Sequence, residues 1–113
     1  MSEKVVMIIV KSKPFSGLNY YEALRTASGL LSQHRVILVW MGDGVYAALK
    51  NADQTLTGQF FEIFQGMEIN LYVEEEALKE RGLGKDDIIP NAQVVSREKI
   101  SDLILTTQAS IVY

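Results

Sequence analysis

The sequence predicts an α/β fold: a three-layer α/β/α sandwich with a mostly parallel sheet of about five strands, in a single domain over residues 1–113. Two apolar runs, residues 5–10 and 36–41, lack polar alternation, which is typical of strands buried on both faces of a parallel sheet. Segments with helical spacing separate these runs from each other and from three later strand-like segments. This alternation is the pattern of successive β-α-β units.

Composition limits the chemistry of the chain. Its 113 residues can bury about two thirds of the unfolded surface in one core. The 11 Lys and Arg residues are scattered and are outnumbered by 14 Asp and Glu, so direct nucleic-acid binding is not expected. The absence of cysteine and the single histidine exclude disulfides, thiolate chemistry and a histidine-rich metal site. We therefore predict no catalytic residue, no metal and no cofactor.

The N-terminal apolar run is short. Residues 5–10 are too few for a signal-peptide core or a membrane span, and Lys11 ends the run. We therefore expect a soluble, cytoplasmic protein with no membrane association.

The first half of the chain alternates between buried strands and helices. Asn19 followed by Glu22 predicts a helix N-cap with its returning carboxylate, and apolar residues then recur at helical spacing to residue 31. After the strand 36–41, residues 45–49 are expected to form a short helix. Residues 57–65 predict a further helix that Gly66 ends.

The second half predicts less deeply buried elements. Residues 68–73 alternate as a strand, and residues 74–81 predict a helix with acidic residues at its start and basic residues at its end. Gly82 fits a Schellman ending, in which Leu83 would contact Leu78. After a short strand at 92–95, Ser96 is expected to cap a helix, and residues 110–113 finish as a strand.

The turn after the strand 36–41 is the first candidate site. It follows the carboxyl end of a central strand, where ligands and partners usually bind in open α/β sheets. The pattern Gly42-x-Gly44-x-x-Ala47 also has partial similarity to a dinucleotide fingerprint, although the helix behind it is broken and no acidic residue ends the next strand at the usual distance. We predict a binding or interface site that comprises Gly42, Asp43, Gly44, Val45 and Tyr46.

Other polar residues have simpler interpretations. Glu74, Glu75 and Glu76 could hold a hard metal ion or act as acid and base, but adjacent helical residues diverge, which favours a solvated helix start. His34 is expected to be a surface histidine. Lys11 and Lys13 could hold an anion in the loop 11–17, but solvated loop lysines are the preferred interpretation.

Three phenylalanines, Phe60, Phe61 and Phe64, lie on the predicted helix 57–65. Because neighbouring helix positions diverge while positions four apart align, we expect one of the three to lie outside the core face. A core role for all three is the alternative. With Met67 and Tyr72 close behind, the segment would contribute to the interface of a homo-oligomer, near the Gly42-Asp43-Gly44 turn.

Five short segments together resemble a known family. They are Lys13-Pro14 with Gly17, residues 22–30 (EALRTASGL), residues 42–46 (GDGVY), residues 78–83 (LKERGL) and residues 102–105 (DLIL). Over the whole chain the sequence resembles the DsrE/DsrF/TusC family of small sulfur-relay proteins. The resemblance implies a DsrEFH-like three-layer domain that forms dimers, trimers or hexamers, including mixed complexes. In these complexes a persulfide passes between cysteines for tRNA thiolation or sulfur oxidation.

The sequence departs from the sulfur-carrying members at one position. Their cysteine lies where a strand meets the helix before Arg81-Gly82, and the resemblance places Glu74 there. A carboxylate cannot form a persulfide. The resemblance therefore implies a non-catalytic, TusC- or DsrF-like subunit or accessory protein that binds a related cysteine-bearing subunit. The alternative is a small-molecule or nucleotide-binding protein that uses the Gly42-Asp43-Gly44 edge.

Overall fold

The computed structural model describes residues 4–14 and 17–113, so residues 15 and 16 of the predicted loop 11–17 lie outside the described part. No helix within that part is long and apolar enough to cross a lipid bilayer. The elements in chain order are β1 (Val5–Val10), α1 (Asn19–Leu30), β2 (Arg35–Trp40), the 3₁₀ helix η1 (Gly42–Ala48), α2 (Gly58–Gln65), β3 (Asn70–Glu74), α3 (Glu75–Glu80), the 3₁₀ helix η2 (Lys85–Asp87), β4 (Gln93–Val95), α4 (Arg97–Ile104) and β5 (Ala109–Val112).

The sheet is parallel throughout. Its five strands lie in the order β4-β3-β2-β1-β5, so the mostly parallel sheet of about five strands is confirmed. β2 lies at the centre and is buried along all but its first residue, as its unbroken apolar run predicts. Its carboxyl end leads directly into η1, which places the Gly42-Asp43-Gly44 turn beside the ends of β1 and β3.

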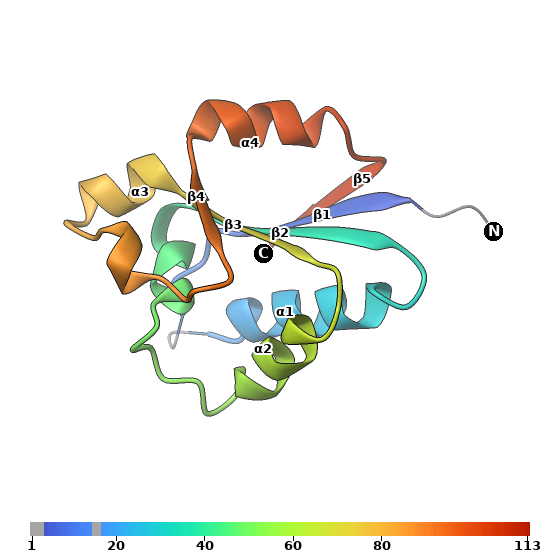
Figure 1. Ribbon diagram of the computed structural model, residues 1–113, viewed down its shortest axis with the longest axis horizontal. Coiled ribbons are helices and arrows are strands. Elements are labelled where there is room, and N and C mark those ends of the chain that lie inside the picture. The colour runs from blue at the N-terminus through green and yellow to red at the C-terminus, as the bar shows by residue number, and fades with distance from the viewer. Residues whose placement is uncertain (1–3, 15–16) are drawn as a thin grey trace.

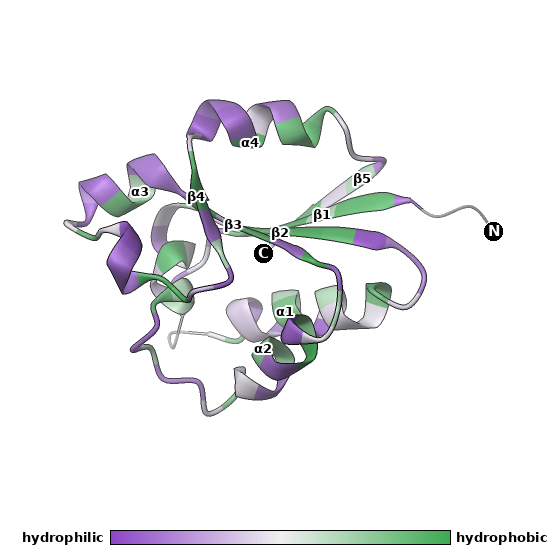
Figure 2. Ribbon diagram, in the orientation of Figure 1, coloured by the Kyte–Doolittle hydropathy of each residue, from purple (hydrophilic) through white to green (hydrophobic). Residues whose placement is uncertain are grey.

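Helices cover both faces of the sheet, which confirms the three-layer sandwich (Figure 1). α1 and α2 pack on one face against side chains such as Ile8, Leu38 and Trp40. α4 covers the other face, where Ile100 packs with Met7, Ile9, Ile37 and Val39. The central strands are hydrophobic, whereas α3 and the start of α4 are hydrophilic (Figure 2). α3 lies beyond the carboxyl end of β3, at one end of the sheet.

Three of the four predicted helix termini have the expected geometry, including the end of α2 at Gly66. The Oγ of Ser96 accepts a hydrogen bond from the N–H of Lys99 at 3.1 Å, which caps α4. Gly82 has φ +68°, and the N–H of Leu83 donates to the carbonyl of Leu78 at 2.9 Å, as in a Schellman ending. The expected cap at Asn19 is wrong, because Asn19 is itself the first residue of α1 and Leu18 holds the N-cap position, with no side-chain cap hydrogen bond. The side-chain amide of Asn19 donates to Ser12 in the loop after β1.

The expectation that one phenylalanine of α2 lies outside the core is wrong. Phe60, Phe61 and Phe64 are all buried, with at most 8% of their surface exposed. The reason is that α2 packs on α1 as well as on the sheet: the ring of Phe60 lies 5.5 Å from that of Tyr21, and the ring of Phe61 lies 6.2 Å from that of Trp40. The argument that these rings form an oligomer interface through exposure therefore fails.

Candidate functional site

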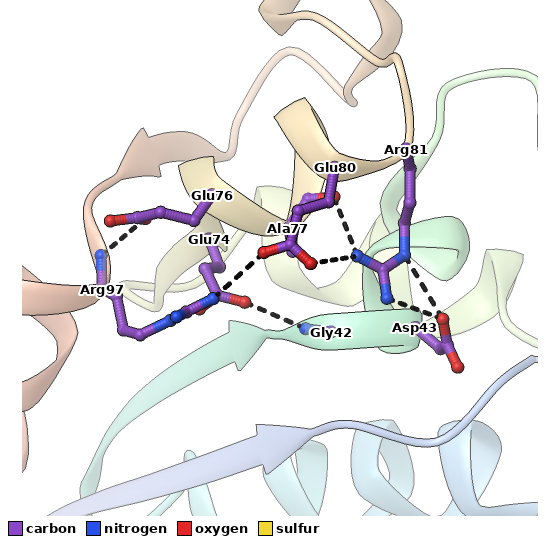
Figure 3. A network of polar contacts seen from close by, with 8 residues as sticks. All are labelled: Gly42, Asp43, Glu74, Glu76, Ala77, Glu80, Arg81 and Arg97. Carbon is purple, nitrogen blue, oxygen red and sulfur yellow. Dashed lines mark hydrogen bonds and ion pairs between the residues drawn. The ribbon is translucent and has the colours of Figure 1, made fainter.

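The two predicted site segments meet at the carboxyl edge of the sheet. Because β2 and β3 are adjacent and parallel, their ends bring η1 and the start of α3 together. The N–H of Gly42 donates to Oε1 of Glu74 at 3.0 Å, across 32 residues of sequence. Figure 3 shows this contact within a network of polar contacts that also includes two arginines, Arg81 and Arg97.

Glu74 is a buried carboxylate with both oxygens engaged. It is the last residue of β3 and only 2% exposed. While Oε1 accepts from Gly42, Oε2 accepts from Nε of Arg97 at 2.5 Å. A buried charge is tolerated when a counter-charge and hydrogen bonds satisfy it, and this site supplies both. The carboxylate therefore has a structural role in joining β3 to η1 and α4.

Arg97 is the cationic centre of this part of the network. As the first residue of α4, it donates its backbone N–H to Oε1 of Glu76 at 2.8 Å and approaches Glu80 with Nη2 at 3.5 Å. The hydrogen bond with Glu74, supported by the nearby carboxylates, raises the pKa of Arg97. Hydrogen bonds from its own backbone N–H and from that of Arg97 lower the pKa of Glu76. The start of α4 is thus held against α3.

A second ion pair orders the side chains of η1. Nη2 of Arg81 donates to Oδ1 of Asp43 at 2.8 Å, and Nη1 donates to the carbonyl of Ala77 at 3.0 Å. The guanidinium also lies 5.9 Å from the centre of the Tyr46 ring, within cation–π range. The hydrogen bond from Arg81 is the main cause of the lowered pKa of Asp43, to which Lys13 also contributes. Asp43 and Tyr46 are therefore presented in defined positions.

The two glycines of the turn have different requirements. Gly42 has φ +52°, a left-handed conformation that favours glycine. At Gly44 a Cβ would lie 2.0 Å from the carbonyl oxygen of Val10, so only glycine lets η1 approach the end of β1 this closely. This backbone contact places η1 against the end of β1, while the hydrogen bond from Gly42 to Glu74 joins η1 to β3.

The turn does not have the geometry of a phosphate-binding loop. The N–H of Gly42 is bonded to Glu74, and the N–H of Gly44 donates to the carbonyl of Met41 at 2.9 Å. In a dinucleotide site such amides face the pyrophosphate, and here a carboxylate occupies the place of the anion.

The side chains of the acidic run 74–76 diverge, but the interpretation of all three as a solvated helix start is wrong for Glu74, which is the last residue of β3 and is buried, so that α3 begins only at Glu75. Glu74 points into the network, Glu75 lies 3.8 Å from Lys79, and Glu76 accepts from Arg97. No group of three potential metal-ligating side chains occurs within residues 4–14 and 17–113. His34 lies far from this edge, at the start of β2, where Nδ1 accepts from the N–H of Lys4 at 3.2 Å.

Three features of the site were missed by sequence reasoning. A pocket of about 320 Å³ lies beside η1 and is lined by Lys13, Pro14, Tyr46, Leu49, Asn51 and Ala52. Arg81 was noted only as a helix-end cation, although its place in the Arg-Gly-Leu segment was a signal. Arg97 carried no signal, because nothing in the sequence links it to a strand end 23 residues earlier.

Comparisons with known proteins identify the architecture. The crystal structure of the ychN protein from E. coli is similar to this structure with a TM-score of 0.84 at 18% sequence identity, covering 99% of this chain and 100% of that chain. The structure of MTH1491, a protein of unknown function from Methanobacterium thermoautotrophicum, has a TM-score of 0.74 at 18% identity, with the same coverage. Because both sequence identities are only 18%, these similarities support the fold and nothing further. No curated protein matches the chain.

A family comparison goes further than the fold. The DsrE/DsrF-like family matches residues 4–113, which includes every strand and helix of the sandwich. By this match over nearly its full length, the chain belongs to the DsrE/DsrF-like family.

Proposed function

We propose that this chain is a non-catalytic, TusC- or DsrF-like accessory subunit of a sulfur-relay complex for tRNA thiolation or sulfur oxidation. Membership of the DsrE/DsrF-like family supports a role related to sulfur relay. The finer proposal depends on one observation: Glu74 occupies the strand end at which the resemblance places the persulfide-forming cysteine, and the chain contains no cysteine.

The environment of Glu74 supports a structural rather than a chemical role. The side chain is buried, and its two oxygens accept hydrogen bonds from Gly42 and Arg97. Sulfur transfer requires a thiolate nucleophile, which a carboxylate cannot replace. A cysteine for the relay must therefore come from another subunit, as the proposal requires.

The surface proposed to contact that subunit is η1, with residues 42–46 at its centre. Tyr46 is 36% exposed and packs beside Arg81, while Asp43 is held by the same guanidinium. Aromatic and arginine side chains in ordered positions are typical of residues that contribute strongly to binding. A partner would meet a surface that needs little reorganisation, which lowers the entropic cost of association.

Affinity purification from the native organism tests the proposal. The tagged wild-type chain should recover a related subunit that carries a cysteine, and Tyr46→Ala should recover less of it. Met67→Ala is the matched control, since Met67 is 44% exposed but lines a cleft at the opposite end of β2 and β3. The proposal would be contradicted if the wild type recovered no related subunit. It would also be contradicted if Tyr46→Ala and Met67→Ala reduced the amount of recovered subunit equally.

A small-molecule binding function is the second candidate, and the pocket beside η1 favours it. A volume of about 320 Å³ is at the lower end of the range for ligand sites. Its lining by Tyr46, Leu49 and Ala52 suits a small, largely apolar ligand rather than a nucleotide phosphate. Saturable binding of such a ligand by the isolated chain, without any related subunit among its purified partners, would favour this alternative.

A further inference from the structure

A cleft opens at the amino ends of β2 and β3, at the end of the sheet opposite η1. This amino-end cleft has a volume of about 430 Å³, larger than the pocket beside η1 and within the usual range of ligand sites. It arises because β3 begins only at Asn70, opposite Ile37, whereas β2 begins two residues earlier, at Arg35. Figure 2 shows this first part of β2 as hydrophilic and the remainder as hydrophobic.

One backbone donor of β2 faces the cleft without an acceptor. The N–H of Arg35 donates to the carbonyl of Lys4 at 2.9 Å, toward β1, so the N–H of Val36 points toward β3. In a continued ladder the carbonyl of Glu68 would accept from it, but within residues 4–14 and 17–113 no carbonyl does so. Val36 is only 1% exposed, and buried backbone donors are almost always paired. An acceptor on a bound ligand would satisfy this group.

Opposite charges line the two walls of the cleft and do not neutralise each other. Arg35 and Glu68 both line it, and both are exposed. Among the described residues, neither side chain forms an ion pair with the other or with any neighbour. His34 adds a donor on the β2 side, because its Nδ1 accepts from the N–H of Lys4 at 3.2 Å and the neutral ring then carries its hydrogen on Nε2. The cleft thus offers donors on the β2 side and a carboxylate on the β3 side.

The cleft also has an apolar side. Leu31 and Ile69 line it and pack against the core beneath α1 and α2. Met67, just after α2, is 44% exposed and adds an adaptable thioether to the lining. Asn70 is in register with Ile37, whose side chain belongs to the core under α4. The apolar residues therefore gather toward the face covered by α1, while the amide of Asn70 lies on the face covered by α4.

We propose that the amino-end cleft binds a free α-amino acid with an apolar side chain. The α-carboxylate accepts from the N–H of Val36 and from the side chains of Arg35 and His34. The α-ammonium pairs with Glu68, and the apolar side chain lies against Leu31. The two charged groups of an amino acid share one carbon, which suits walls formed by adjacent strands about 4.8 Å apart.

The ligand is a zwitterion because each wall disfavours the opposite alternative. The carboxylate of Glu68 would repel the phosphates of a nucleotide, and the guanidinium of Arg35 would repel a simple amine. The cleft lies at the end of the sheet away from η1. This proposal and that of an accessory subunit therefore fail independently.

Three related probes separate the contributions of the two charges. L-leucine carries both groups, isocaproate lacks the ammonium, and isoamylamine lacks the carboxylate. Calorimetric titration of the full chain should give saturable binding of L-leucine, and binding of each analogue should be about tenfold weaker or more, because each loses one charged contact. Saturable binding of neither L-leucine nor L-phenylalanine, or equal affinity for L-leucine and its two analogues, would overturn the proposal.

Two neutral substitutions assign each charge to its wall. Arg35→Gln should weaken L-leucine binding about tenfold and remove the preference for L-leucine over isoamylamine, whereas Glu68→Gln should remove the preference over isocaproate. Because both side chains are exposed, neither substitution should change thermal unfolding. Arg25→Gln is the control, since Arg25 pairs with Glu22 on α1 and does not line the cleft. Equal loss of L-leucine binding in Arg25→Gln and Arg35→Gln, or unchanged preferences in both cleft variants, would overturn the proposal.

Discussion

Glu74 shows how one side chain connects three segments that are distant in sequence. Its carboxylate accepts from Gly42 in η1 and from Arg97 in α4, while its own backbone ends β3. Among the described residues, every buried side-chain nitrogen or oxygen has a hydrogen-bond partner. The network therefore depends on each member having its partner, and removal of the central acceptor affects all three segments.

The first prediction concerns this acceptor. Glu74→Ala should lower the free energy of unfolding by about 1–3 kcal/mol, because it leaves the N–H of Gly42 without its acceptor and Arg97 without its nearest carboxylate. Urea unfolding measures the change. Glu75→Ala is the control at the neighbouring position, and because its pair with Lys79 is exposed it should cost at most about 1 kcal/mol. Equal losses in the two variants would contradict the role assigned to Glu74.

The second prediction concerns Asp43 and pH. Its pKa in the folded chain lies below the ordinary value of 3.8, mainly because of the hydrogen bond from Arg81. The ionised carboxylate therefore stabilises the fold above the ordinary pKa, and this contribution is lost as the pH falls through the folded pKa. The stability difference between wild type and Asp43→Asn should be constant near neutral pH and shrink in acid. A difference that stays constant throughout acid titration, measured by urea unfolding, would refute this linkage.

At the scale of elements, η1 and α2 are positioned by contacts on more than one side. η1 follows β2 but approaches the carbonyl of Val10 at the end of β1 through Gly44. α2 packs on both the sheet and α1, which is why all three of its phenylalanines are buried. Each element is therefore held by contacts with more than one neighbouring element.

The third prediction follows from the close approach of η1 to β1. Gly44→Ala should destabilise the fold by about 3 kcal/mol or more, because its Cβ would lie 2.0 Å from a backbone oxygen that no rotamer change can move. Gly42→Ala should cost only about 1 kcal/mol, since the space around it is open and the penalty comes from its φ of +52°. Thermal and urea unfolding of both variants measure which substitution lowers the free energy of unfolding more. A larger decrease for Gly42→Ala than for Gly44→Ala would contradict the prediction.

At the scale of the whole molecule, the proposed contact surface lies at the carboxyl edge of the parallel sheet. This edge presents η1 with the ordered side chains of Asp43 and Tyr46, which the guanidinium of Arg81 holds. The strand β5 lies at a different edge of the sheet, next to β1.

The fourth prediction concerns the chemistry of the entire chain. Incubated with a cysteine desulfurase and labelled cysteine, the purified protein should acquire no label that reductant releases. The chain has no thiol, and the thioethers of Met41 and Met67 do not form persulfides. A related cysteine-bearing subunit serves as the positive control. Reductant-labile label on the isolated chain would contradict a non-catalytic role.

Features that depend on neighbouring residues were predictable from the sequence. The buried central strand follows from the apolar run 36–41, and the ends of α3 and α4 follow from Gly82 and Ser96, because these signals act within one or two turns of backbone. The meeting of η1 with the start of α3 was not predictable, because it depends on β2 and β3 being neighbours in the sheet, and the sequence alone does not determine the strand order. The start of α1 was not predictable from the Asn19–Glu22 pattern, because the helix begins one residue earlier than this pattern requires, with Leu18 in the N-cap position.

By itself, the sequence determined the strands and helices, the parallel α/β class and the absence of a thiol, since periodicity and composition are properties of the chain alone. Only the tertiary structure decided that Glu74 pairs with Arg97, that all three phenylalanines of α2 are buried and that β5 lies at an open edge. These features depend on strand order and helix packing. Contacts of this kind join residues far apart in sequence, and no local pattern encodes which of them will meet.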